Sequence, residues 1–199
     1  MKKIFLAVLF LSGLGIFQSN AQFQAGLVLG LDVPVGGFSS WYRPGICFGA
    51  TGKYSVNEKM VVGGNLHYNS FSGDRFQDPY YYDNWRNKAS VTAFTGLFHY
   101  YFSEDKLKPY AGADLGFYFW RSRYYYNYYW VNPAGNHVYK YDYHTAHGTA
   151  LGIAPTGGIT YDITDKLVFD GNVKFNLMIT EANLNYVGFN LGLFYKFGE

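Results

Sequence analysis

YVGFNLGLFYKF (residues 186–197) alternates large apolar side chains with small or polar ones at almost every position. Successive side chains of a β-strand point to opposite faces, so this pattern predicts a strand with one apolar face and one polar face. KLVFDGNVKFNLMI (166–179) follows the same rule, and Asp170 and Lys174 fall on its polar face. A soluble sheet also alternates, but there the polar face points outward and is usually charged.

The composition indicates whether the apolar faces of the strands lie in a soluble core or against membrane lipid. Charged residues make up 15% of the chain and aromatic residues 22%, with 24 glycines in 199 residues, whereas a soluble domain carries about 25% charged residues. Beyond the N-terminal segment no run of 18 apolar residues occurs, so no transmembrane helix is predicted. Low charge, abundant Tyr, Phe and Gly, and repeated alternation together predict a transmembrane β-barrel.

The N-terminal segment, MKKIFLAVLFLSGLGIFQSNAQ (1–22), has the pattern of a secretory signal peptide. Lys2 and Lys3 precede an apolar stretch, and small residues precede a cleavage site near Ala21. We therefore expect a signal peptide over 1–21 and an outer-membrane barrel over 22–199. The net charge of +2 gives no indication of a nucleic-acid partner, and Cys47, the single cysteine, cannot form an internal disulfide.

Reading the alternation along the chain gives eight strands, and hence an all-β, eight-stranded antiparallel up-and-down barrel. The predicted strands are roughly 22–33, 45–56, 60–72, 89–103, 108–124, 146–163, 166–180 and 186–198. Short charged connections alternate with longer segments rich in Tyr, Trp, Asp and Asn, which is typical of periplasmic turns and extracellular loops. An even number of strands predicts that both termini lie on the periplasmic side.

Three segments carry a resemblance to a known group of proteins. SEDKLKPYAGADLGFYF (103–119), ITYDITDKLVFDGNVKFN (159–176) and VGFNLGLFYKF (187–197) resemble small eight-stranded outer-membrane barrels of the OmpA/OmpX kind, in the version common in Bacteroidota. The resemblance covers nearly all of the chain after the signal peptide, and it implies fold and location more than function. Such barrels often end on an aromatic residue, whereas Gly198 and Glu199 follow the last one here.

The inward faces of the predicted strands carry charges of both signs. An eight-stranded barrel is just wide enough for its side chains to fill it, so these residues predict a polar network that plugs the lumen. A narrow channel for protons, ions or small solutes is the alternative. The predicted network comprises Lys53, His67, His99, Asp114, Asp170, Lys174 and Lys196.

Two chemical alternatives find little support in the spacing. Asp142 and His144 share a strand face, but His147 points to the opposite face, which does not suit a metal site. His67 and Ser70 likewise fall on opposite faces, so with Asp74 they form no nucleophile–base arrangement for a lipid-modifying enzyme. We therefore predict no cofactor, no metal and no enzymatic activity.

RYYYNYYWVNPAGNHVYKYDYHTAH (123–147) and RFQDPYYYDNWRNK (75–88) hold the most unusual residues. Turn residues 132–136 separate two Tyr-rich, β-favouring arms, which predicts a hairpin continuing the fifth and sixth strands beyond the membrane. Tyr124, Tyr143 and Trp120 are assigned to the aromatic girdle. The remainder form a candidate recognition surface, since exposed Tyr and Trp suit binding: Tyr80, Tyr81, Tyr82, Trp85, Tyr128, Tyr129, Trp130, Tyr139 and Tyr141.

These features predict a non-enzymatic surface protein with a structural or adhesive role. The expected partners are outer-membrane lipid, lipopolysaccharide and an extracellular protein or glycan. We expect the protein to be a monomer.

Overall fold

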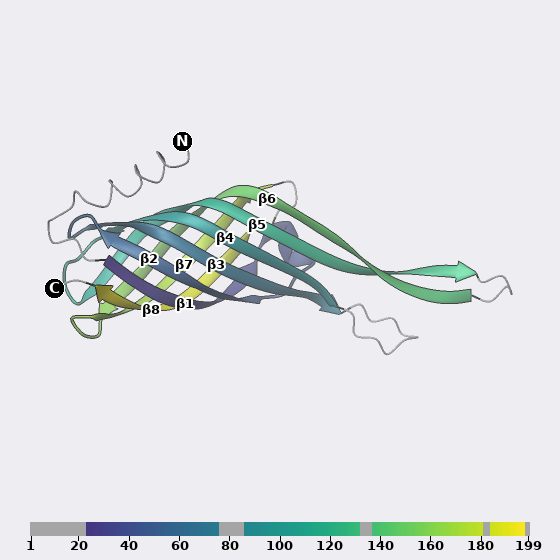
Figure 1. The fold of residues 1–199 in the computed structure, drawn as a ribbon, viewed down its shortest axis with the longest axis horizontal. Helices are drawn as coiled ribbons and strands as arrows, with labels where there is room; N and C mark the ends of the chain where they lie inside the picture. Colours follow the sequence, from purple (N-terminus) through teal and green to yellow (C-terminus); the bar gives the residue numbers. More distant parts are fainter. Residues whose placement is uncertain (1–22, 76–85, 132–136, 181–183, 198–199) are drawn as a thin grey trace, which may run out of the picture.

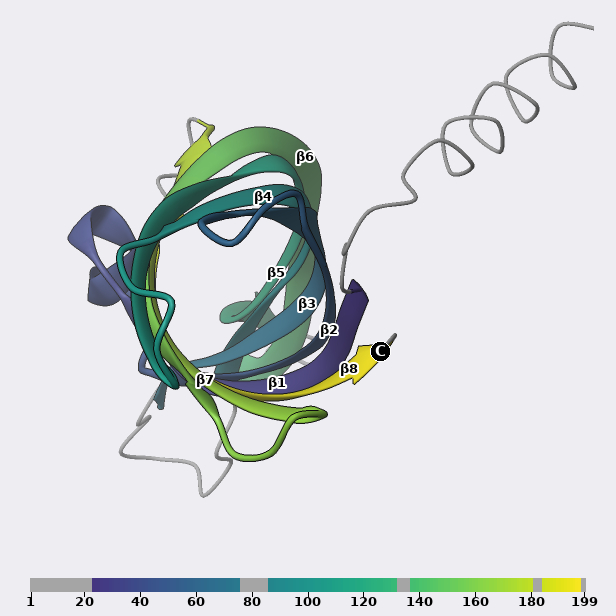
Figure 2. The same ribbon diagram turned by 90° about the vertical axis from the view of Figure 1, so that its left-hand side faces the viewer.

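The computed structural model describes residues 23–75, 86–131, 137–180 and 184–197, and describes only the backbone of 74, 75, 86, 126–131 and 137–141. Its eight strands form one closed antiparallel barrel (Figures 1 and 2) in which each strand pairs with its chain neighbours and β1 pairs with β8. The strands are β1 (Phe23–Pro34), β2 (Gly45–Ser55), β3 (Met60–Arg75), β4 (Arg86–Tyr101), β5 (Leu107–Val131), β6 (His137–Asp162), β7 (Leu167–Ile179) and β8 (Tyr186–Phe197).

The alternation in the sequence decides which side chains face outward. On β8, Leu191 and Leu193 are exposed, while Asn190 before them and Phe194 after them are buried in the barrel. On β1, Leu27 is 72% exposed and Val28 only 4%. Exposed aliphatic and aromatic side chains of this kind form the wall that hydrocarbon covers in a membrane barrel.

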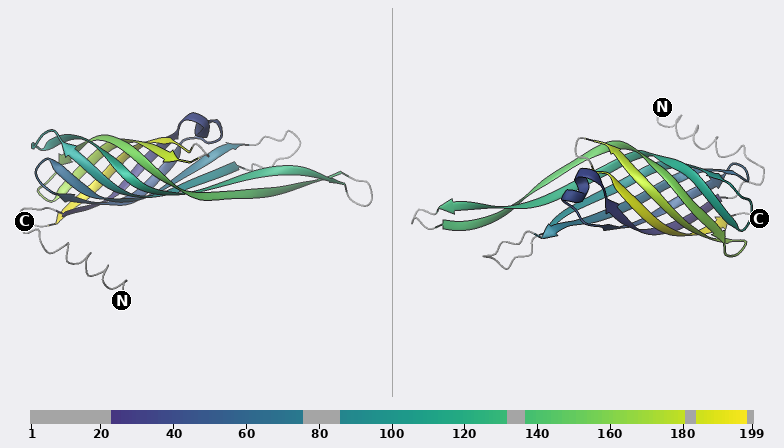
Figure 3. Two further views of the ribbon diagram at one scale, coloured as in Figure 1. Left: turned by 90° about the horizontal axis from the view of Figure 1, so that it is seen from above. Right: turned by 180° about the vertical axis from the view of Figure 1, so that it is seen from behind.

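The predicted fold class and all eight strands are confirmed. The observed strand ends differ from the predicted ones by up to three residues, with two exceptions. β5 continues to Val131 and β6 begins at His137, and these two extensions correspond to the arms of the predicted hairpin. Pairing continues to Val131↔His137, so the two strands form a twisted ribbon beyond the barrel (Figure 3). Among the described residues, no helix is both long and apolar enough to cross a membrane.

Pro155 interrupts the barrel wall between β6 and β7. The two strands pair at Ile153↔Leu177 and again at Thr156↔Lys174, but not at the two positions in between. Proline has no backbone N–H to donate, so it normally avoids strands that are paired on both sides. The pairing of Pro155 with Ala113 of β5 is kept, which confines the break to one side of β6.

The two ends of the barrel differ. At one end, the start of β1 pairs with the end of β8 at Phe23↔Phe197, beside the turns 56–59, 102–106 and 163–166. We call this the turn end. At the other end, which we call the ribbon end, the connection after β1 contains a short 3-10 helix, η2 (Gly36–Ser40), that the sequence analysis did not predict.

Candidate functional site

Two of the three buried carboxylates in the described part of the lumen, Asp170 and Asp114, are each bound by a lysine. Asp170 of β7 pairs with Lys53 of β2. Tyr110 donates a hydrogen bond to the same carboxylate at 3.0 Å, and Asn172 donates another at 2.8 Å. Because Lys53 and Asp170 are 3% and 1% exposed, each charge depends on the other for compensation.

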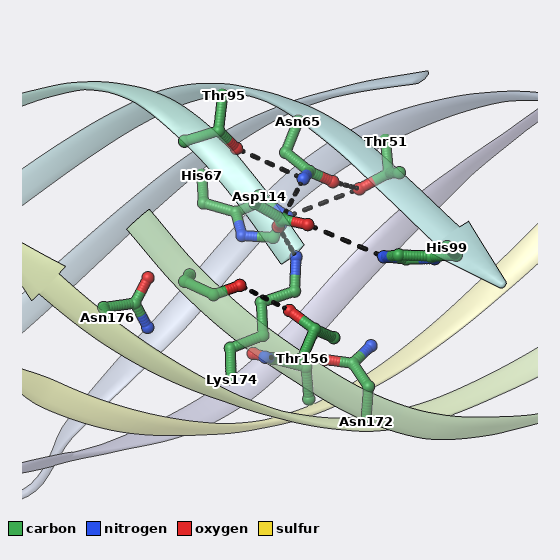
Figure 4. Close-up of polar contacts among 12 residues, drawn as sticks. Thr51, Asn65, His67, Thr95, His99, Asp114, Thr156, Asn172, Lys174 and Asn176 are labelled. Carbon is green, nitrogen blue, oxygen red and sulfur yellow. Dashed lines mark hydrogen bonds and ion pairs between the residues drawn. The ribbon is translucent and has the colours of Figure 1, made fainter. Parts of the chain in front are cut away.

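Asp114 of β5 is the second centre (Figure 4). Lys174 Nζ lies 2.5 Å from Asp114 Oδ2, and Asn65 Nδ2 donates to the same oxygen at 2.8 Å. His99 Nε2 lies 3.5 Å from the other carboxylate oxygen. The Asn65 side chain also accepts a hydrogen bond from Thr51 at 2.7 Å, so the polar contacts connect strands across the lumen.

These contacts leave little space inside the barrel. Two cavities in the lumen have volumes of about 10 Å³ each, which is close to the minimum for one water molecule. His67 and Lys174 line both cavities. The lumen is therefore filled by side chains in this conformation, as the size of an eight-stranded barrel allows.

A third charged group lies at the turn end. Asp162, the last residue of β6, binds Lys196 Nζ at 2.9 Å and Lys108 Nζ at 3.2 Å. Lys196 was predicted to belong to the polar network of the lumen, but it binds Asp162 at the turn end and lies outside the two interior centres.

Aromatic side chains close the ribbon end. Phe38 of η2 is 2% exposed and packs edge-on against Phe71, which in turn packs against Tyr186. The Tyr42 ring contacts Phe38, and its hydroxyl lies 2.6 Å from Ser122 Oγ. Burial raises the pKa of the Tyr42 hydroxyl, so that this contact stays between two neutral hydroxyl groups.

The β5–β6 ribbon, defined here as residues 124–131 and 137–144, rises from this end. Cross-strand contacts support its base: the Tyr125 and Tyr143 rings lie 5.9 Å apart, and the Tyr124 and His144 rings 5.3 Å apart. The Arg123 guanidinium lies 4.9 Å from the centre of the Tyr143 ring. Aromatic cross-strand pairs stabilise a two-stranded ribbon by about 0.2–1 kcal/mol each.

The predicted site residues have different outcomes. Lys53, His67, His99, Asp114, Asp170 and Lys174 are all buried in the lumen. The backbone of Tyr128, Tyr129, Trp130, Tyr139 and Tyr141 lies in the ribbon, but their side chains are outside the described part of the structure. Tyr80, Tyr81, Tyr82 and Trp85 lie outside the described residues altogether.

One assignment to the girdle was wrong. Trp120 packs against the internal aromatic cluster instead of facing lipid, because it shares a strand face with the inward Tyr118. Tyr124 and Tyr143 are 41% and 54% exposed.

The structure separates His67 from Ser70, the base and nucleophile of the catalytic arrangement that the sequence analysis considered. His67 is buried in the lumen, while Ser70 pairs with Ile46 on the outward face. Within the described ranges, no group of three or more His, Cys, Asp or Glu side chains could hold a metal ion.

Several polar residues of the lumen were missed by the sequence analysis. Strand parity could have identified Asp32, since it alternates with the outward Leu29, Leu31 and Val33. The others are uncharged side chains within otherwise apolar strands, and alternation alone gives them no more weight than any other inward residue. The missed set comprises Asp32, Thr51, Asn65, Asn69, Thr95, Thr156, Thr160, Asn176 and Asn190.

Solved structures place this fold among small bacterial membrane barrels. A major outer membrane protein of Thermus thermophilus matches with a TM-score of 0.54 at 13% identity, over 90% of this chain and 100% of that one. Neisserial surface protein A matches at 0.53 and 17%, over 90% and 98%. Ail, the attachment invasion locus protein of Yersinia pestis, matches at 0.51 and 12%, over 89% and 97%.

No curated protein sequence matches this chain. The closed barrel, the lipid-type outer wall and the neighbouring structures define the chain as a small outer-membrane β-barrel protein. The model of the Opacity family of porin proteins matches residues 75–197, which is more than half of the chain. The chain therefore belongs to the Opacity porin family, and the predicted resemblance to small outer-membrane barrels is confirmed.

Proposed function

We propose that this protein is a non-enzymatic surface recognition protein: the plugged barrel anchors it in the outer membrane, and the β5–β6 ribbon presents a Tyr-rich binding surface. The observation that carries the proposal is the length of the ribbon. β5 pairs with β4 only up to Lys88↔Arg123, and β6 with β7 only up to Leu151↔Ile179, yet β5 and β6 remain paired to Val131↔His137.

The ribbon has no role in closing the barrel. A barrel wall needs strands long enough to cross the membrane, about 9–11 residues, whereas β5 and β6 have 25 and 26 residues. The arms that project carry Tyr and Trp, which supply a large contact area with few rotatable bonds. In this proposal the turn end and both termini are periplasmic, the ribbon is extracellular, and its partner is an extracellular protein or glycan.

The filled lumen supports this function over a channel. Asp170 and Asp114 are each paired with a lysine, and the two cavities in the lumen are each just large enough for about one water molecule. Steady conduction would require these ion pairs to separate.

Two variants test recognition by the ribbon. In the first, residues 126–142 are replaced by Asn-Gly, which favours a tight hairpin closing on the Tyr125–Tyr143 pair. In the second, Tyr128, Tyr129, Trp130, Tyr139 and Tyr141 become Thr, which keeps a high β-propensity but removes the rings. Cells producing each variant at equal surface level are assayed on arrays of glycans and extracellular-matrix proteins.

We expect wild-type cells to bind a subset of the array and both variants to lose that binding. The Thr variant shows whether binding depends on the aromatic rings or on the ribbon backbone. Retained binding in both variants would remove the ribbon as the recognition surface.

A further inference from the structure

Four basic side chains gather on the outward face of the barrel, just below the ribbon. Lys88 of β4 lies directly opposite Arg123 of β5, and Arg121 of β5 lies directly opposite His147 of β6. We call these four residues the outer basic cluster. Lys88, Arg121 and His147 are exposed, and Arg123 is half-buried.

Among the described residues, this arrangement of like charges is unfavourable. Like charges placed directly opposite on neighbouring strands are destabilising, and Lys88 and Arg123 form such a pair. Across the described ranges, none of the ion pairs involves any of the four side chains. The nearby Asp142 accepts a hydrogen bond from the backbone N–H of Tyr143. An anion bound among the four side chains would offset the repulsion.

The position of the cluster along β5 indicates which anion this is. The apolar outward face of β5 runs from Leu107 to Phe119, with Phe117 and Phe119 each 50% exposed, and this length is sufficient to cross the hydrocarbon core. Arg121 is the next outward residue. The cluster therefore lies at the level of the lipid headgroups, directly above side chains that contact acyl chains.

We infer that the outer basic cluster binds the phosphate groups of the outer-leaflet glycolipid, lipopolysaccharide, while the aromatic wall beneath it contacts the acyl chains. A guanidinium group can bind phosphate through two parallel hydrogen bonds. The Tyr143 ring, 4.9 Å from the Arg123 guanidinium, holds that side chain against the barrel by a cation–π contact. A soluble polyanion would make no use of the apolar wall below.

The test compares two triple variants with the same loss of charge. K88Q/R121Q/R123Q removes the three permanent charges of the cluster, and K59Q/K106Q/K166Q removes three exposed lysines at the turn end. Each refolded full-length protein is titrated in neutral detergent with bisphosphorylated lipid A, with the dephosphorylated glycolipid and with phosphatidylglycerol, and bound lipid is counted by native mass spectrometry. Heat-modifiable mobility on gels checks folding.

We expect the cluster variant to bind bisphosphorylated lipid A at least about tenfold more weakly, since it loses the charged hydrogen bonds of three side chains to phosphate. The turn-end variant should bind like wild type, and wild type should prefer the bisphosphorylated lipid. Equal weakening in both variants, or equal binding of the dephosphorylated lipid or of phosphatidylglycerol by wild type, would overturn the inference. The wild-type comparisons hold even if the cluster variant fails to fold, and none of these outcomes depends on recognition by the ribbon.

Discussion

At the scale of single residues, four buried charged side chains in the barrel interior compensate one another in two ion pairs. Lys53 and Asp170 come from strands far apart in sequence and meet across the lumen, where Lys53 Nζ also lies 4.3 Å from the centre of the Phe194 ring. A buried ion pair often adds little net stability, but removing one partner leaves an uncompensated charge in a low-dielectric interior.

Lys53→Met should therefore destabilise the barrel by about 3–5 kcal/mol, whereas Lys53→Met combined with Asp170→Leu should recover most of that loss. The measurement is urea unfolding of the refolded protein in lipid vesicles, followed by tryptophan fluorescence. Lys106→Met, an exposed change of the same type at the turn end, is the control. A double variant as unstable as the single one would show that Lys53 and Asp170 do not act as a pair.

At the scale of elements, the ribbon depends on the register of β5 against β6. The pairs Tyr125↔Tyr143 and Tyr129↔Tyr139 belong to one uninterrupted register that begins inside the barrel at Leu107↔Tyr161. The barrel wall, which fixes which residues face inward, therefore sets the register of the projecting arms as well.

Cysteines introduced for Tyr129 and Tyr139 should form a disulfide under mild oxidation. Residues directly opposite in an antiparallel pair have Cα atoms about 4.5–5.5 Å apart, which suits a disulfide. Cysteines for Tyr129 and Lys140 are the control, because Lys140 pairs with Tyr128 and points to the other face. The readout is a gel shift under non-reducing conditions, and equal cross-linking in both variants would contradict the register.

The sequence predicted strands better than it predicted connections. Alternation identifies β8 because Leu191 and Leu193 must meet lipid while Asn190 must not. The 3-10 helix η2 was missed because Phe38 is an isolated apolar residue among glycines and serines, without any periodicity. The misplacement of Trp120 has the opposite cause: its residue type suited the girdle, but the strand parity placed it inside.

The interior centres could be predicted only in part. Parity identified the charged residues of both ion pairs but was not applied to Asp32. Partner choice depends on strand tilt and stagger, which pair Lys53 with Asp170 and Lys174 with Asp114. Alternation along one strand carries no information on either quantity.

At the scale of the whole molecule, a filled barrel with a projecting ribbon should behave as an anchor and not as a pore. The purified protein in planar lipid bilayers should show no steady open channel, because the interior ion pairs and aromatic cap occupy the lumen. A large porin measured in the same bilayer is the control. Steady single-channel currents from the wild-type protein would favour the narrow-channel alternative.

The most direct test of the central claim is proteolysis of intact cells. Chymotrypsin added from outside should cut wild-type protein within residues 126–142, and the remaining barrel should stay folded and heat-modifiable. The variant in which Asn-Gly replaces 126–142 should lack that cleavage. If chymotrypsin cuts this segment only after the outer membrane is permeabilised, the ribbon is not extracellular, and both the orientation and the proposed recognition function are wrong.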